Sequence, residues 1–130
     1  MQQNKHMNDI QTRNDLEKLL WAFYRKLLAD PSINYIFIRV AQIDLDAHMP
    51  SLTDFWEQML LERNGYKKNV MQIHLDLNEK EKLTAEHFTI WLNHFNATVD
   101  EMYAGNIAEN AKTRALSIAT VMRVKLADAL

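Results

Sequence analysis

The sequence predicts an all-α protein with five or six helices in one domain. Only two glycines and two prolines occur in 130 residues, which favours long helices over a fold with many turns. Apolar residues recur every three or four positions in several long stretches, which is the period of a helix with one buried face. One segment, INYIFIRVAQI at 33–43, has a strand-like composition, but no second segment of this kind is available to pair with it. We therefore predict short helical turns there, with Phe37 packed on the core.

The first predicted helix begins at Asn14, a favourable N-cap, with Glu17 completing a capping box. Asp30 and Pro31 end it. Its buried face consists of Leu16, Leu19, Leu20, Phe23, Leu27 and Leu28. Tyr24 lies at the edge of that face, where its ring can be buried while its hydroxyl reaches a polar partner. On this pattern alone, ordinary core packing is the more frequent role for such a tyrosine.

The second long helix is predicted from Asp44 or Asp46 to about Asn64, with Gly65 as its C-terminal stop. Pro50 fits only near the first turn of this helix. The buried face consists of Leu52, Phe55, Trp56, Met59 and Leu60. His48 precedes Leu52 by four residues and is therefore predicted to point inward.

A loop and a short helix carrying His74 are predicted from Tyr66 to Leu77. Thr84 then caps a helix that ends before Gly105. A last helix is predicted from about 107 to 127, and its buried face consists of Ile107, Ala111, Ala115, Ile118, Met122 and Leu126. The predicted core face of the helix after Thr84 consists of Phe88, Leu92, Phe95, Val99 and Met102. Trp91 lies at the margin of this face, and His87 and His94 lie nearer the polar side, where we expect them to be solvated.

Composition argues against several classes of function. A net charge of −2 and an isoelectric point near 6.2 predict no nucleic-acid partner and no anionic membrane surface. No apolar run approaches a membrane span or a secretory signal, so we expect a cytoplasmic protein. The absence of cysteine excludes disulfides and thiolate metal ligands. Residues 1–130 are expected to form a single domain, with 1–9 as a disordered or weakly packed extension.

Two inward-pointing histidines make a cofactor site conceivable. His48 and His74 lie on separate predicted helices, and the connection between them contains Gly65, which allows the chain to reverse. Both imidazoles could then face one cavity from opposite sides. Two unrelated core histidines are the more common arrangement, and spacing alone does not decide between these readings.

Four separated segments resemble the third group of truncated haemoglobins, which are small bacterial globins with a two-over-two helical fold around haem b. These segments are FYRKLLAD, HMPSLTDFW, HLDL and FTIWLNHFNATVDEMYAG, in this order, and the resemblance extends from about Ile10 to Met122. The chain has Leu45 where the family often has tryptophan, and Lys68 and Val70 where it often has glycine and proline.

The resemblance implies that His74 is the axial ligand of haem iron. It places Tyr24, His48 and Trp91 on the distal side, as the residues that stabilise a bound ligand. His48 would donate a hydrogen bond, swing outward as a gate or ligate the iron itself. The remaining haem contacts would come from Phe37, Leu52, Phe55 and Trp56.

The leading functional prediction is a haem protein that reversibly binds dioxygen, as in oxygen transport, or another diatomic gas. A second reading is a haem enzyme acting on nitric oxide, nitrite or peroxide with electrons from an external reductase. A third is a helical interaction or sensing domain without a cofactor, whose pocket is filled by side chains.

Overall fold

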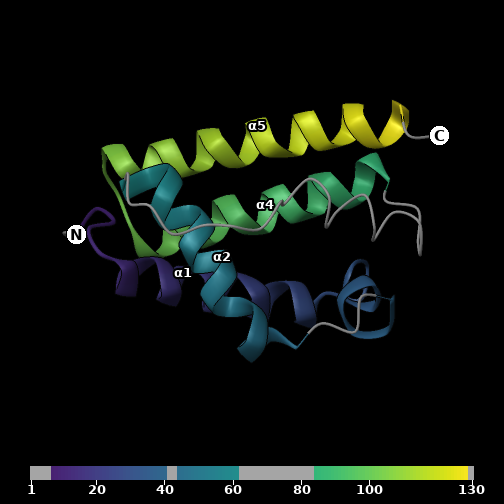
Figure 1. The fold of residues 1–130 in the computed structure, drawn as a ribbon, viewed down its shortest axis with the longest axis horizontal. Coiled ribbons are helices and arrows are strands. Elements are labelled where there is room, and N and C mark those ends of the chain that lie inside the picture. The colour runs from purple at the N-terminus through teal and green to yellow at the C-terminus, as the bar shows by residue number, and fades with distance from the viewer. Residues whose placement is uncertain (1–6, 41–43, 62–83, 129–130) are drawn as a thin grey trace, which may run out of the picture.

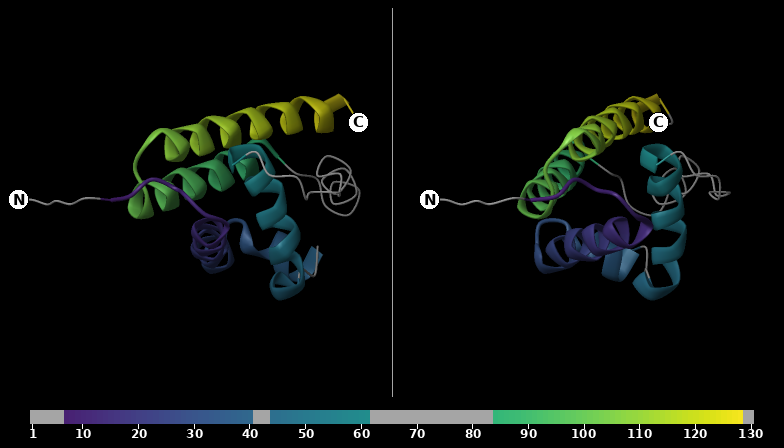
Figure 2. Two further views of the ribbon diagram at one scale, coloured as in Figure 1. Left: turned by 60° about the vertical axis from the view of Figure 1, so that its left-hand side comes forward. Right: turned by 90° about the vertical axis from the view of Figure 1, so that its left-hand side faces the viewer.

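The computed structural model describes residues 7–40, 44–61 and 84–128 of the chain. Its elements are α1 (Arg13–Ala29), the π-helical turn η1 (Ile36–Val40), α2 (Leu45–Leu61), α4 (Ala85–Met102) and α5 (Asn106–Asp128) (Figure 1). Helix α1 packs on α2 and α4 packs on α5, and the two pairs meet through α1 with α4 and α2 with α5 (Figure 2). This two-over-two helical sandwich confirms the predicted fold class. No strand occurs in the described residues.

The N-cap of helix α1 lies two residues before the predicted one. Thr12 is the N-cap, and its hydroxyl accepts a hydrogen bond from the backbone N–H of Asp15 at 3.2 Å. The Asp15 carboxylate accepts in return from the N–H of Thr12 at 3.1 Å. The prediction of Asn14 and Glu17 was therefore wrong, because the reciprocal pair forms two residues earlier, with aspartate in place of glutamate.

The strand-like segment after α1 is helical, as predicted. Ile33 and Ile36 are buried, Phe37 is half-buried against the core, and residues 36–40 form the π-helical turn. Residues 41–43, the end of the predicted segment, lie outside the described part of the chain.

Helix α2 differs from its prediction in the position of Pro50. This proline lies inside the helix, beyond the first turn, because α2 already begins at Leu45. Arg13, at the start of α1, binds the carboxylates of Asp54 and Glu57 on α2 at 2.6 and 2.9 Å, which holds the two helices together. The predicted end of this helix, at Asn64 and Gly65, lies outside the described residues.

Helix α4 begins after Thr84 and ends before Gly105, as predicted. Helix α5 is capped from a distant part of the chain, because the Asp9 carboxylate accepts hydrogen bonds from the backbone N–H groups of Ile107 and Ala108, both at 2.8 Å. A carboxylate is favourable there because of the positive end of the helix dipole. Ala104 N–H also donates to the Asn8 carbonyl at 3.1 Å. The packed part of the chain therefore includes residues 8 and 9, which we had placed in the N-terminal extension.

We expect Gly105→Ala to lower the free energy of unfolding by about 2 kcal/mol. Gly105 has a φ of 143°, a conformation that side chains disfavour. An added Cβ would also lie 2.5 Å from Cγ of Asp9, so the cap of α5 would have to move. Urea denaturation measures the effect, with Asn106→Ala at the neighbouring exposed position as control. A loss no larger than that of the control contradicts this account.

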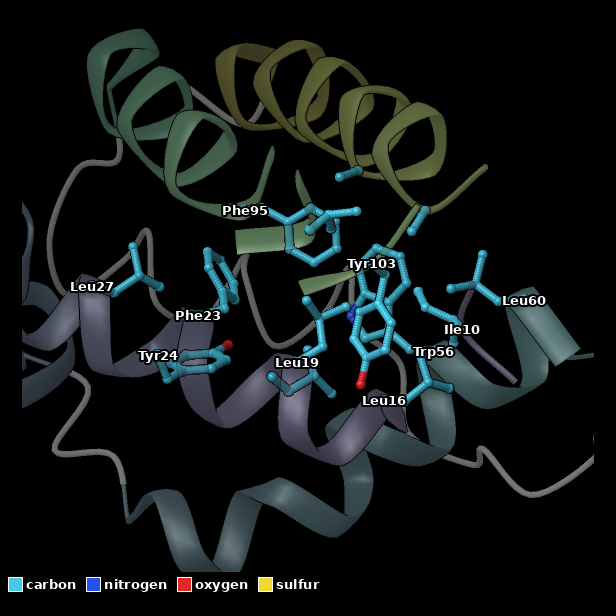
Figure 3. Close-up of a cluster of buried hydrophobic side chains, with 14 of the residues drawn as sticks. Ile10, Leu16, Leu19, Phe23, Tyr24, Leu27, Trp56, Leu60, Phe95 and Tyr103 are labelled. Carbon is cyan, nitrogen blue, oxygen red and sulfur yellow. The ribbon is translucent and has the colours of Figure 1, made fainter. Parts of the chain in front are cut away.

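The core is built around aromatic rings from three helices. Phe95 of α4 is fully buried and contacts Phe23 of α1 edge-on at a centroid distance of 5.1 Å. On other sides it stacks on Trp56 of α2 at 4.9 Å and on Trp91 at 5.9 Å. Figure 3 shows Phe95, Phe23 and Trp56 within one cluster of buried side chains. The cluster joins both layers and fixes the angle at which they meet.

Candidate functional site

A cavity lies between α1, the segment around η1, α4 and α5. It contains about 540 Å³ of space not filled by protein atoms, part of which is open to solvent. Small-molecule sites are lined mainly by apolar and aromatic side chains. The residues lining this cavity are Tyr24, Ile33, Ile36, Phe37, His87, Phe88, Trp91, Ile118, Ala119 and Met122.

Tyr24 is the buried polar residue of this cavity. Its side chain is 8% exposed, and burial raises the pKa of its hydroxyl to about 12. Among the described residues no group hydrogen-bonds to this hydroxyl. Among the described residues, the enclosed side-chain atom that lacks a hydrogen-bond partner is Asn96 Oδ1 and not the Tyr24 hydroxyl. The phenol is protonated in the neutral range, so it is a hydrogen-bond donor without a protein acceptor in the described structure.

Trp91 and Phe37 lie in the same cavity as Tyr24. Phe23 lies between Tyr24 and Trp91, with ring centroids 5.1 Å from the first and 5.7 Å from the second. Phe37 packs edge-on against Tyr24 at 5.9 Å and 87°. The structure therefore brings together three of the residues singled out from the sequence, from three separate elements. A phenol and an indole, both donors, are held in fixed relation by packed rings.

Of the two histidines expected to face one cavity, only His48 lies in the described residues. His48 is half-buried in the first turns of α2 and does not line this cavity. His74, with Lys68 and Val70, lies outside the described residues. The positions of these side chains therefore remain predictions.

The other three residues predicted to line the site occupy different surroundings. Phe55 borders a second cavity of about 610 Å³ between α2 and α5, which meets the first at Ile118 and Met122. Leu52 is half-buried against the core. Trp56 is 5% exposed and stacks on Phe95, so it supports the site through the core without lining the first cavity.

His87 and His94 are half-buried and hydrogen-bonded to other side chains, whereas we expected both to be solvated. His87 is half-buried in the cavity wall, and its Nε2 lies 3.0 Å from the Tyr35 hydroxyl. His94 Nε2 lies 2.7 Å from the Asp30 carboxylate. Hydrogen bonds from the Ser32 side chain and from His94 lower the pKa of Asp30 to about 2. Helical periodicity placed both histidines toward the polar face, but the segment after α1 covers that side of α4.

The apolar cavity residues on α4 and α5 had been assigned only to the core. Phe88, Ile118 and Met122 fit the buried helical pattern, and the same pattern cannot distinguish a residue facing a neighbour from one facing a cavity. His87 had a recognisable signal, because it occupies the third position after the Thr84 cap, where a side chain reaches back to the cap.

The described residues contain neither a candidate metal-binding cluster nor a candidate membrane-spanning helix. No group of three or more histidine and acidic side chains is arranged to hold a metal ion within residues 7–40, 44–61 and 84–128. In the same residues, no helix combines the length and the apolar character that crossing a bilayer requires.

The fold and the cavity define a class of protein: a small two-over-two helical sandwich with an aromatic-lined cavity between its layers. The crystal structure of a group III truncated haemoglobin from Campylobacter jejuni is similar, with a TM-score of 0.81 and 25% sequence identity over 93% of this chain and 95% of that one. Comparison with protein-family models and with curated protein sequences gave no match. The chain therefore resembles the group III truncated haemoglobins in fold and in sequence.

Proposed function

We propose that this protein binds haem b and, on the haem iron, reversibly binds dioxygen or another diatomic gas. The observation that carries the proposal is the Tyr24 hydroxyl, a buried donor without a described partner in a cavity that also contains the Trp91 indole. The similarity to a group III truncated haemoglobin supports haem as the occupant.

The cavity suits a flat and largely apolar cofactor. Its wall contains the rings of Phe37, Phe88 and Trp91 together with aliphatic side chains from the segment before η1 and from α5. The second cavity, bordered by Phe55 and Met59, adjoins it at Ile118 and Met122. Apolar surface on both sides of α5 is therefore available to cover a macrocycle, whose burial is favourable by about 25 cal/mol per Å².

The chain's own groups would act as follows. Haem iron, when bound, supplies an open coordination position for the gas. Tyr24 and Trp91 would donate hydrogen bonds to a ligand there, and neither donor has another partner in the described residues. In a site that excludes water, each such bond is worth about 1–2 kcal/mol. The packing of Phe23 between the two rings holds both donors in place.

His74 is proposed as the axial ligand of the iron, since a neutral imidazole is a good iron ligand and haem proteins commonly use one. His48 is proposed as a third distal residue. The proposed haem contacts are completed by Phe37, Leu52 and Phe55. Trp56, also expected at the haem, would support the site through its packing on Phe95.

The assignment of His74 is tested by His74→Ala in the haem-loaded protein. We expect loss of the iron–histidine stretching band in the resonance Raman spectrum of the ferrous form, and its partial recovery when imidazole is added. His94→Gln is the matched control, because His94 is also a histidine but pairs with Asp30. A His74→Ala variant with the wild-type band would refute this ligand.

A further inference from the structure

His87, in one wall of the cavity, contacts Tyr35, which does not line the cavity itself but lies in the segment that forms another wall. His87 lines it from the first turn of α4, and Tyr35 lies in the segment that contributes Ile33, Ile36 and Phe37 to the opposite wall. The His87 Nε2 and the Tyr35 hydroxyl oxygen are 3.0 Å apart, and the two rings meet edge-on at 5.9 Å. The contact therefore spans the edge of the cavity.

The hydrogen bonds of His87 fix its tautomer. The backbone N–H of Thr84 donates to Nδ1 at 3.1 Å, so Nδ1 carries no proton. A neutral imidazole has one donor and one acceptor nitrogen, and Nε2–H must then donate to the Tyr35 hydroxyl oxygen. Both ring nitrogens are thereby occupied. His87 forms part of the wall but has no free nitrogen to offer to a molecule inside the cavity.

Apart from this hydrogen bond, the two walls are joined at this edge mainly by apolar packing. Between residues 33–38 and α4, the described structure contains no other hydrogen bond or ion pair. The neighbouring link, from His94 to Asp30, holds α4 to the end of α1 instead. Separation of the two walls at this edge is therefore opposed mainly by the Tyr35–His87 bond and by the apolar packing around it.

We propose that the Tyr35–His87 hydrogen bond is a latch that closes this edge of the cavity and limits how fast the occupant leaves. His87 is a positioning residue in this role, since it holds the wall and does not touch the reacting atoms. The identity of the occupant rests on the proposed function, in which it is haem. The tautomer and the closure of the edge rest on the geometry alone.

The test is Tyr35→Phe, which removes one oxygen and leaves both the ring and the Thr84–His87 cap in place. The rate of haem transfer to excess apomyoglobin is measured. We expect it to rise about fivefold, which corresponds to about 1 kcal/mol. Tyr103→Phe is the matched control: its hydroxyl donates to the Asp15 carbonyl at 3.2 Å, also joins two elements, and does not line the cavity. The control should destabilise the fold and leave the transfer rate within twofold of wild type.

A transfer rate for Tyr35→Phe within twofold of wild type, or an equal rise in Tyr103→Phe, would overturn the latch. A second readout does not depend on haem: ¹⁵N NMR of histidine in the cofactor-free protein should show His87 with its proton on Nε2, and in Tyr35→Phe a less restricted ring. A wild-type His87 protonated on Nδ1 would equally overturn the proposal. Failure of the wild-type chain to take up haem would refute the proposed function, and the NMR result would then decide the latch.

Discussion

Replacing Tyr24 with phenylalanine is expected to weaken the protein's hold on a gas ligand and to leave the stability of the cofactor-free protein nearly unchanged. The Tyr24 hydroxyl has no hydrogen-bond partner in the described residues and is not among the enclosed atoms without a partner, so its removal should change the free energy of unfolding by less than about 0.5 kcal/mol. In the haem-loaded protein the same change removes a donor to the ligand. The dissociation rate of dioxygen should then rise about tenfold, as expected for about 1.4 kcal/mol.

Urea denaturation and stopped-flow ligand replacement measure the two effects. Tyr103→Phe is again the appropriate control, because its hydroxyl has a partner in Asp15 and its loss should destabilise the fold without changing ligand release. A Tyr24→Phe protein that is less stable than wild type, with unchanged dioxygen release, would show that this hydroxyl serves the fold and not a ligand.

Phe95→Ala is expected to give the largest loss of stability, about 3–5 kcal/mol. Phe95 is fully buried, and Phe23, Trp56 and Trp91 pack around it. Truncating it leaves a hole among three rings that hold one another, so the surroundings cannot collapse fully into the space. Phe95 also packs against Trp91, which is one of the cavity donors, and against Phe23, which contacts both donors. Haem affinity should therefore fall as well.

The stability change is measured by urea denaturation, followed by both far-ultraviolet circular dichroism and tryptophan fluorescence. Leu116→Ala, at an exposed position of α5, is the control and should change the free energy of unfolding by less than about 0.5 kcal/mol. A loss below about 1.5 kcal/mol for Phe95→Ala would contradict the central place of this ring in the core.

The sequence predicted the helices better than their exact beginnings. Thr84 has a clear local signal and begins α4 as expected. At α1 both Thr12 and Asn14 are acceptable caps, and the choice depends on which carboxylate reaches back, which is Asp15. The cap of α5 could not be predicted from local sequence at all, because Asp9 comes from the other end of the chain.

Helical periodicity could predict only part of the cavity lining. Periodicity places Tyr24 and Trp91 at the margins of their buried faces, and margins are where two packed helices diverge and leave space. Periodicity placed Trp56 on the buried face of its helix, and its stacking on Phe95 agrees with that position in the core. His87 was assigned to solvent because the position of Tyr35, 52 residues away, depends on the path of the chain between helices.

Titration of the cofactor-free protein with haem, followed by absorption in the Soret region, tests the central claim most directly. The account predicts an intense, sharpened Soret band that saturates at one haem per chain, with visible bands that report whether the iron has five or six ligands. A spectrum that remains that of free haem at every ratio would contradict it.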